Sequence, residues 1–291
     1  MGNEKCKPIN WQEKSGMQGR RIILAIVVMC LAVGSAKSDA IGHSIKKGIG
    51  MGLGKHPAIW ATRLTQLHVH WFYTWGSQRP AATPATVRFV PMIWGYYPRS
   101  LPAALRQIRD YNAKGQVHDL LGFNEPDNKT QSRISVRRAL QAWPQLESTG
   151  LTLGSPACVH PDDPWMRNFM RGVRQHHNRV NFICIHWYGG PNPRGFIGML
   201  RNIHNLYHRP LWITEFAVGD WSANKTRPNK FSPTVIARFM KAVLPVMNRL
   251  PYVQRYAWFP AGASKVTALG TSALFKKNGS LTALGRIYAS D

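Results

Sequence analysis

The feature that most constrains the fold is an alternation of eight short apolar runs with longer segments that mostly read as helices. Each run is nearly continuous in β-branched, aromatic or other apolar residues, as is typical of parallel strands covered on both faces. Eight such runs over about 240 residues predict an α/β fold, a (β/α)8 TIM barrel in a single domain. An open doubly wound sheet is the alternative, but no glycine-rich phosphate loop follows any run, which counts against its nucleotide-binding form. The runs span residues 47–53, 66–75, 87–94, 117–126, 150–157, 181–189, 210–218 and 253–260.

Five of the intervals between the runs show clear helix signals. The segment that begins at Ser232 and Pro233 has a good cap and first-turn pair. Another segment opens with two acids and a proline, as helix starts often do. The first two helices of the barrel are the least clear in the pattern. We expect helices over residues 100–115, 135–150, 162–177, 193–208 and 232–250.

The N-terminus differs from the rest of the chain. Residues 1–21 are polar and basic, residues 22–33 are apolar, and small residues follow. This order predicts a secretory signal over residues 1–36, with cleavage after Ala36 or, as a second candidate, after Ala40. The catalytic domain would then cover residues 41–291 of a secreted, extracellular protein. An uncleaved membrane anchor is the alternative, but twelve or so apolar residues are short for a bilayer core.

The composition allows a large core and carries an extreme charge. With 44% hydrophobic residues, disorder is not expected, and the formal net charge is +25. Nucleic-acid binding requires a clustered patch or a known module. Lysine and arginine are instead scattered, so we expect no nucleic-acid partner. A solvated basic surface is the plain interpretation, with loose attraction to anionic cell-wall surfaces as an addition. Of the two cysteines after the signal, Cys184 lies within a predicted strand and favours a buried free thiol over a disulfide with Cys158.

Two of the three glutamates after residue 36 lie at the ends of predicted strands. Glu125 ends the fourth run and Glu215 the seventh, whereas Glu147 is expected to be solvated on a helix. Because the carboxyl ends of barrel strands meet at one face, the two strand-end glutamates should oppose each other there. Such a pair suits glycoside hydrolysis, in which one carboxyl is protonated and the other ionised. This chemistry needs no metal or cofactor. A structural ion pair with a barrel arginine is the alternative for either residue taken alone.

Aromatic side chains gather at the same strand ends and suit the apolar faces of sugar rings. We expect Trp75, Trp94 and Trp258 in the cleft. His186 and Tyr188 share the end of the sixth run and should bond a carboxylate or a sugar hydroxyl. Any one of these aromatics could instead be an ordinary core residue. Pro126 is expected to hold the residue before it in an extended backbone.

Nine motifs in order along residues 46–290 resemble glycoside hydrolase family 128, the glycosyl hydrolase catalytic core. The resemblance implies a retaining (β/α)8 barrel with endo activity on β-1,3-glucan. It implies that Glu125 is the acid/base and Glu215 the nucleophile, and that Asn124 bonds the sugar hydroxyl next to the anomeric carbon. Tyr188 would orient the nucleophile, and Trp258 would form the floor of the cleaved subsite. The motifs are KKGIGMGL, WFYTWG, FVPMIWG, LLGFNEPDN, GSPA, FICIHWYGG, PLWITEFAV, YAWFP and NGSLTALGRIYAS.

Together these observations favour a secreted, monomeric endo-β-1,3-glucanase without cofactor or metal. A non-hydrolytic β-glucan-binding protein on the same barrel is one alternative. A hydrolase of another polysaccharide, such as an anionic one that suits the basic charge, is a second. A nucleic-acid binder is the third and the least favoured.

Overall fold

The computed structural model describes residues 43–291, apart from residues 54–56 and 265. The predicted signal, its cleavage sites and the alternative anchor lie outside these residues. Among the helices that are described, none combines the length and the apolar character needed to cross a bilayer.

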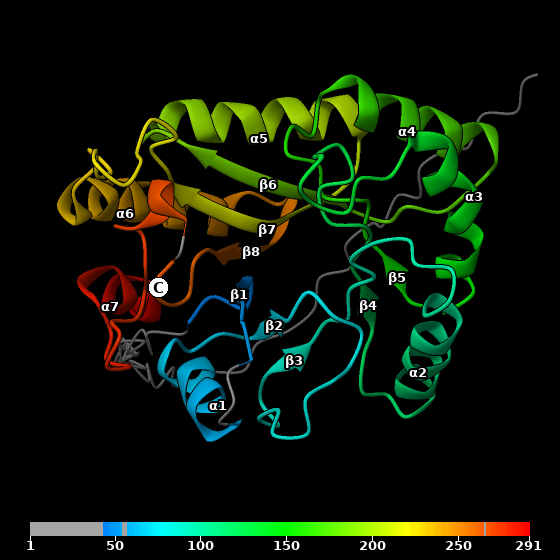
Figure 1. The fold of residues 1–291 in the computed structure, drawn as a ribbon, viewed down its shortest axis with the longest axis horizontal. Coiled ribbons are helices and arrows are strands. Elements are labelled where there is room, and N and C mark those ends of the chain that lie inside the picture. Colours follow the sequence, from blue (N-terminus) through cyan, green and yellow to red (C-terminus); the bar gives the residue numbers. More distant parts are fainter. Residues whose placement is uncertain (1–42, 54–56, 265) are drawn as a thin grey trace, which may run out of the picture. The chain divides into compact units, whose positions relative to one another are not determined.

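Eight parallel strands form the centre of the fold, one in each predicted run (Figure 1). Six of them pair in the order β3-β2-β1-β8-β7-β6, and β4 pairs with β5. Single parallel bridges, Met92 with Leu121 and Gly154 with Phe182, connect the two groups. The strands therefore neighbour one another in chain order, and β8 returns to β1, which confirms the (β/α)8 barrel. They are β1 (Lys47–Gly50), β2 (Trp71–Tyr73), β3 (Arg88–Phe89), β4 (Asp119–Leu120), β5 (Thr152–Leu153), β6 (Ile183–Gly189), β7 (Leu211–Val218) and β8 (Val253–Trp258).

All five clearly signalled helices are present, and side-chain hydrogen bonds cap the first turn of three of them. Ser135, Asn192 and Ser232 each accept a hydrogen bond from a backbone N–H in the first turn of the helix that follows. A further helix follows β1, but β2 and β3 are joined by residues 74–87 without one, so the barrel is irregular there. The helices are α1 (Pro57–Gln66), α2 (Leu101–Ala113), α3 (Val136–Glu147), α4 (Pro164–Gln175), α5 (Pro193–Tyr207), α6 (Pro233–Arg249) and α7 (Ala283–Ser290).

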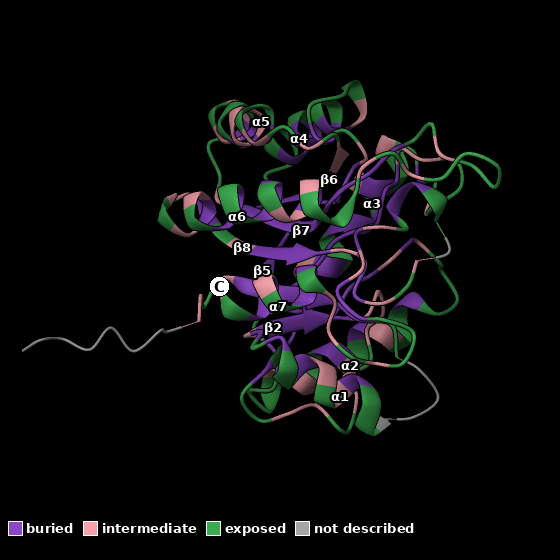
Figure 2. Cartoon of the chain, turned by 90° about the vertical axis from the view of Figure 1, so that its left-hand side faces the viewer, coloured by how far each residue is buried: buried purple, intermediate pink, exposed green. Residues whose placement is uncertain are grey.

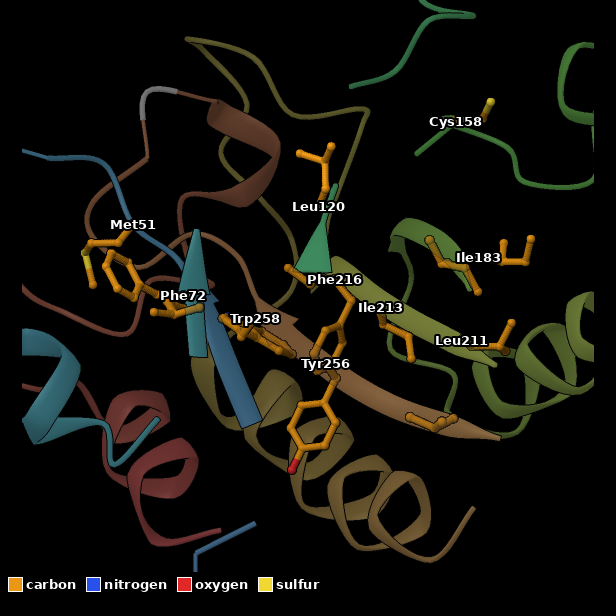
Figure 3. Close-up of a cluster of buried hydrophobic side chains, with 14 of the residues drawn as sticks. Met51, Phe72, Leu120, Cys158, Ile183, Leu211, Ile213, Phe216, Tyr256 and Trp258 are labelled. Atoms are coloured by element: carbon orange, nitrogen blue, oxygen red, sulfur yellow. The ribbon is translucent and has the colours of Figure 1, made fainter. Parts of the chain in front are cut away.

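Two separate hydrophobic layers hold the barrel. The larger layer lies between strands and helices, and its residues include Phe72, Phe216 and Trp258 (Figure 3). The smaller layer fills the barrel interior, where Phe182 stacks on Trp212 with ring centroids 4.0 Å apart. Buried residues follow the strands, while the outer faces of the helices are exposed (Figure 2). The filled interior closes the barrel below its carboxyl ends, where barrel enzymes carry their active sites.

Candidate active site

Glu125 follows β4 in a strained backbone. Its φ is +40°, in the left-handed region that residues other than glycine rarely adopt. The extended backbone expected from Pro126 is therefore wrong. The Glu125 N–H donates to the carbonyl oxygen of Ala157 at 2.7 Å, so the loop after β5 holds the residue in place. Strain of this kind costs about 1–3 kcal/mol and persists where surrounding contacts enforce it.

Glu215 lies within β7, directly opposite His186 of β6. The register between these strands shifts at Ile185 and His186, and the register of β7 with β8 shifts between Ile213 and Phe216. Such irregularities re-aim side chains at strand ends. Glu215 lies between these shifts, and its side chain reaches Tyr73, Trp75 and Tyr188.

The Glu215 carboxylate receives hydrogen bonds from three aromatic side chains. Tyr73 donates to Oε1 at 2.9 Å, and the Trp75 indole N–H donates to the same oxygen at 2.8 Å. The Tyr188 hydroxyl donates to Oε2. Burial, together with the charge of Glu215, raises the pKa of both tyrosines well above the ordinary value. Both hydroxyls therefore stay protonated and act as donors to the Glu215 carboxylate.

Glu125 is bonded by a different pair of groups. Its Oε1 lies 3.0 Å from His186 Nδ1, and its Oε2 accepts from Asn128 Nδ2 at 3.0 Å. Burial acts to raise the pKa of Glu125, but the bonds from His186 and Asn128 outweigh it, and the pKa lies below the ordinary value. Two carboxyl groups at the same barrel mouth thus have distinct environments.

His186 connects the two carboxylates. Besides its contact with Glu125, its Nε2 lies 3.6 Å from Glu215 Oε1. Burial acts to lower the pKa of the fully buried imidazole, but the two carboxylates raise it above the ordinary value. One carboxylate oxygen of Glu125 and one of Glu215 lie within 4.8 Å of each other, with a His186 nitrogen in the same group. A single proton can therefore reside on the histidine or on Glu125.

The same three residues offer the donor types of a divalent cation site. The carboxylate oxygens of the two glutamates, however, already accept hydrogen bonds. Glu215 accepts from three O–H or N–H groups, and Glu125 accepts from the Asn128 amide and faces the His186 nitrogen. A cation here would have to displace several of these donors. The arrangement fits a proton-bonded carboxyl pair better than a metal centre.

A two-chambered cleft opens above the pair. One chamber, of about 580 Å³, extends past His186 toward the start of α4, and the other, of about 490 Å³, extends past Trp75 and Trp94. Trp221 lines both chambers and is 64% exposed. Its indole N–H donates to the carbonyl oxygen of Tyr188 at 2.9 Å, which fixes the ring. The residues that line both chambers are Glu125, Asn128, Val159, Tyr188 and Trp221.

The family model of the glycosyl hydrolase catalytic core matches residues 50–288 of this chain. The chain belongs to this family. Alkali-sensitive linkage protein 1 of Schizosaccharomyces pombe is 28% identical over 232 residues, which cover 76% of this chain and 40% of that protein. The chain thus spans about two fifths of the length of this curated relative.

Solved structures of the catalytic core are similar as well. A family 128 subgroup I endo-β-1,3-glucanase from Amycolatopsis mediterranei, a glutamate-to-alanine mutant with bound laminaripentaose, is 34% identical with a TM-score of 0.74. The match covers 84% of this chain and 99% of that one. A subgroup II endo-β-1,3-glucanase from Sorangium cellulosum is 25% identical with a TM-score of 0.68, covering 84% and 98%.

Seven of the eight predicted site residues of this catalytic core line the cleft, and one does not. Asn124, Trp75, Trp94, His186 and Tyr188 accompany the two glutamates. The side chain of Asn124 donates to Gln131 at 3.2 Å, while its buried Oδ1 has no partner in the described part of the chain.

The prediction for Trp258 is wrong. Its side chain is fully buried and packs edge-on against Phe216 in the layer beneath the helices (Figure 3). The indole N–H donates to the carbonyl oxygen of Ser272 at 2.8 Å. Neighbouring side chains of a strand point to opposite faces, and Ala257 rather than Trp258 faces the barrel interior. Phe259, the next residue, lines the cleft instead and packs edge-on against Trp75.

Several residues of the site and its support escaped prediction. Tyr73, which is buried beneath the cleft, carried a usable signal, because it lies on the inward face of β2 two residues before Trp75. Asn128 and Trp221 lie in loops, where no periodicity places a side chain. Glu147, expected to be solvated, is half-buried and accepts a hydrogen bond from Asn178 at 2.9 Å.

Proposed function

We propose that this protein is a secreted, retaining endo-β-1,3-glucanase, with Glu125 as acid/base and Glu215 as nucleophile. The observation that carries the proposal is the pair itself. Two buried carboxylates with different partners have oxygens within 4.8 Å of each other above a closed barrel. Export is inferred from the basic and apolar N-terminus alone, and the monomeric state is likewise an expectation.

The separation supports direct attack. Carboxyl groups about 5–5.5 Å apart suit retention, whereas inverting pairs stand about 6.5–9.5 Å apart to admit a water molecule. One oxygen of each carboxyl lies within 4.8 Å of the other, and this favours the closer class. Attack by Glu215 on the anomeric carbon would form a glycosyl ester while the bond to the leaving oxygen breaks. Water would then hydrolyse the ester and restore the carboxylate.

The contacts of Glu215 suit a nucleophile. Three donors bond its two oxygens and fix the plane of the carboxylate. Tyr73 and Trp75 bond one oxygen and Tyr188 the other. The attacking oxygen must give up some of these hydrogen bonds as it forms the new bond to carbon. Preorganised donors of this kind limit the rearrangement needed at the moment of reaction.

The contacts of Glu125 suit a residue that both gives and takes a proton. Below the raised pKa of His186, the His186–Glu125 pair holds one proton. At 3.0 Å, that proton can move onto Glu125 as negative charge develops on the leaving oxygen. After the leaving group departs, the same carboxylate can take a proton from the attacking water. His186 can therefore supply the proton that Glu125 donates.

The cleft suits a neutral glucan. Trp75, Trp94 and Trp221 present aromatic surface to the chambers, and sugar rings pack on such surfaces through their C–H faces. Asn124 Oδ1, buried without a partner among described residues, is placed to accept a bond from a sugar hydroxyl. The Amycolatopsis relative was solved with laminaripentaose, and this supports β-1,3-glucan as the substrate here.

The test is hydrolysis of laminarin by wild type, Glu125→Gln and Glu215→Gln, with Glu147→Gln as the matched control. We expect both cleft variants to lose at least about three orders of magnitude in kcat/KM, since each removes a group that acts in the transition state. The control should remain active, and circular dichroism should show all three folded. A ladder of oligosaccharide products would support endo action, whereas glucose alone would reject it.

Binding and hydrolysis assays with the same protein distinguish two alternative functions. A non-hydrolytic β-glucan-binding protein would bind laminarin in a calorimeter and release no reducing ends. A hydrolase of an anionic polysaccharide would turn over uronic-acid polymers faster than laminarin. Either result would replace the proposal.

A further inference from the structure

The outer faces of α4 and α5 carry regular rows of arginine. On α4, Arg167, Arg171 and Arg174 recur at intervals of four and three residues, and on α5, Arg194 and Arg201 are seven residues apart. These intervals place the members of each row on one side of their helix. All five side chains are exposed. We call them the basic face.

No acid of the described residues forms an ion pair with the basic face. Ion pairs of lysine or arginine in the described residues involve Lys114, Lys230 and Arg255, none of which belongs to it. Helices α3 to α6 contain a single acid, Glu147, which is half-buried and bonded to Asn178. The nearest exposed acids, Asp162 and Asp163, precede α4 and adjoin only the Arg167 end of its row.

The row on α4 begins where α5 ends. The Tyr207 hydroxyl at the end of α5 donates to the carbonyl oxygen of Pro161 just before α4, at 2.6 Å. Along α4 the arginines follow one another at about 4.5–6 Å of helix rise, and Arg194 and Arg201 of α5 are separated by about 10 Å. Within each row the charges are therefore spaced by about one Debye length at physiological salt or less.

The chemistry of this face favours a polymer of fixed anions. A guanidinium group pairs with carboxylates through two parallel hydrogen bonds. No large exposed hydrophobic residue of the described chain lies on α3 to α6, so the face offers no apolar side chain to insert in a lipid layer. Like charges held this close repel one another and destabilise the folded state unless counter-charges approach.

We propose that the basic face binds a carboxylate-bearing polysaccharide and so retains the protein on an acidic matrix. The choice of a polysaccharide rests on the proposed function, because the cleft takes a glycan. None of the five arginines lines either chamber of the cleft. Both polymers can therefore be bound at once, and the anionic polymer is not cleaved.

Binding to polygalacturonate at low and at physiological ionic strength tests this proposal. The test variant is Arg171→Glu/Arg174→Glu/Arg201→Glu. The matched control, Arg106→Glu/Lys276→Glu/Lys277→Glu, changes the net charge equally at exposed positions elsewhere. We expect the test variant to bind at least about tenfold more weakly and with a shallower salt dependence, and the control to stay within about threefold of wild type.

Three results would overturn the proposal. Equal weakening in both variants would mean that net charge alone drives binding. Duplex DNA that binds more tightly than polygalacturonate at equal charge concentration would assign the face to a different polymer. Binding that does not change with ionic strength would exclude an electrostatic interaction at the basic face. Laminarin hydrolysis should be unchanged in both variants, so failure here and failure of the proposed function can be told apart.

Discussion

Replacing His186 with phenylalanine removes the hydrogen bond between Nδ1 and Glu125, and the Nε2 that lies near Glu215, while keeping a ring in the buried position. Glu125 then keeps only the Asn128 amide as a side-chain donor, and burial of its carboxylate is no longer offset by the histidine. Bonds to charged groups contribute about 1.5–3 kcal/mol. For a domain of this size, the unfolding temperature should fall by roughly 4–10 °C near pH 6.

The loss should depend on pH in a defined way. The pKa of His186 is raised in the folded protein, so its contribution to stability is full below the ordinary value of 6.5 and is lost as pH rises through the folded value. The pKa of Glu125 is lowered, so its contribution is present above the ordinary value of 4.5 and is lost as pH falls through the folded value. The difference between wild type and variant should therefore be greatest between these two limits.

Calorimetric scans from about pH 4 to about pH 9 measure this difference. His176→Phe, at an exposed position that caps α4, is the matched control and should show no such maximum. A difference in Tm between wild type and His186→Phe that stays constant over the whole range would refute the charged pair. It would reduce the role of His186 to packing.

Three further changes probe the site and its support. Asn128→Asp places a second carboxylate 3.0 Å from Glu125 in place of a donor, which should raise the pKa of Glu125 and lower kcat/KM about tenfold, seen in a pH–rate profile. Trp75→Phe removes the donor to Glu215 and should lower kcat/KM on laminarin by about 30-fold, with a smaller change in KM. Gly154→Ala would place a Cβ against the Phe182 ring in the barrel interior. This overpacking should lower the free energy of unfolding, measured in urea, by about 1–3 kcal/mol. An unchanged free energy of unfolding would contradict this close packing.

The fold could be predicted because the barrel repeats one signal eight times. Each apolar run contains a strand, although several strands are only two residues long. The meeting of Glu125 and Glu215 also followed from the sequence, because carboxyl ends of barrel strands share one face. What the runs could not show was which side of a strand each aromatic occupies. Trp258 was misplaced for this reason, since a run that is apolar on both faces carries no alternation.

The remaining features depend on contacts between distant segments. Sequence preference places the residue before Pro126 in an extended backbone, yet the bond from Glu125 to Ala157 accompanies a positive φ. Trp75 likewise has a positive φ of 59° and bonds a residue 140 positions away. Loop residues such as Trp221 obey no periodicity, so only the folded chain shows them at the cleft.

The anomeric configuration of the first product tests the central claim most directly. Proton NMR of laminarin hydrolysis distinguishes the newly formed reducing end before mutarotation mixes the two anomers. Direct attack by Glu215, with Glu125 as acid and then base, predicts that the β-anomer forms first, because two displacements restore the original configuration. An α-anomer that forms first would mean a single displacement by water and would contradict the assignment of Glu215 as nucleophile.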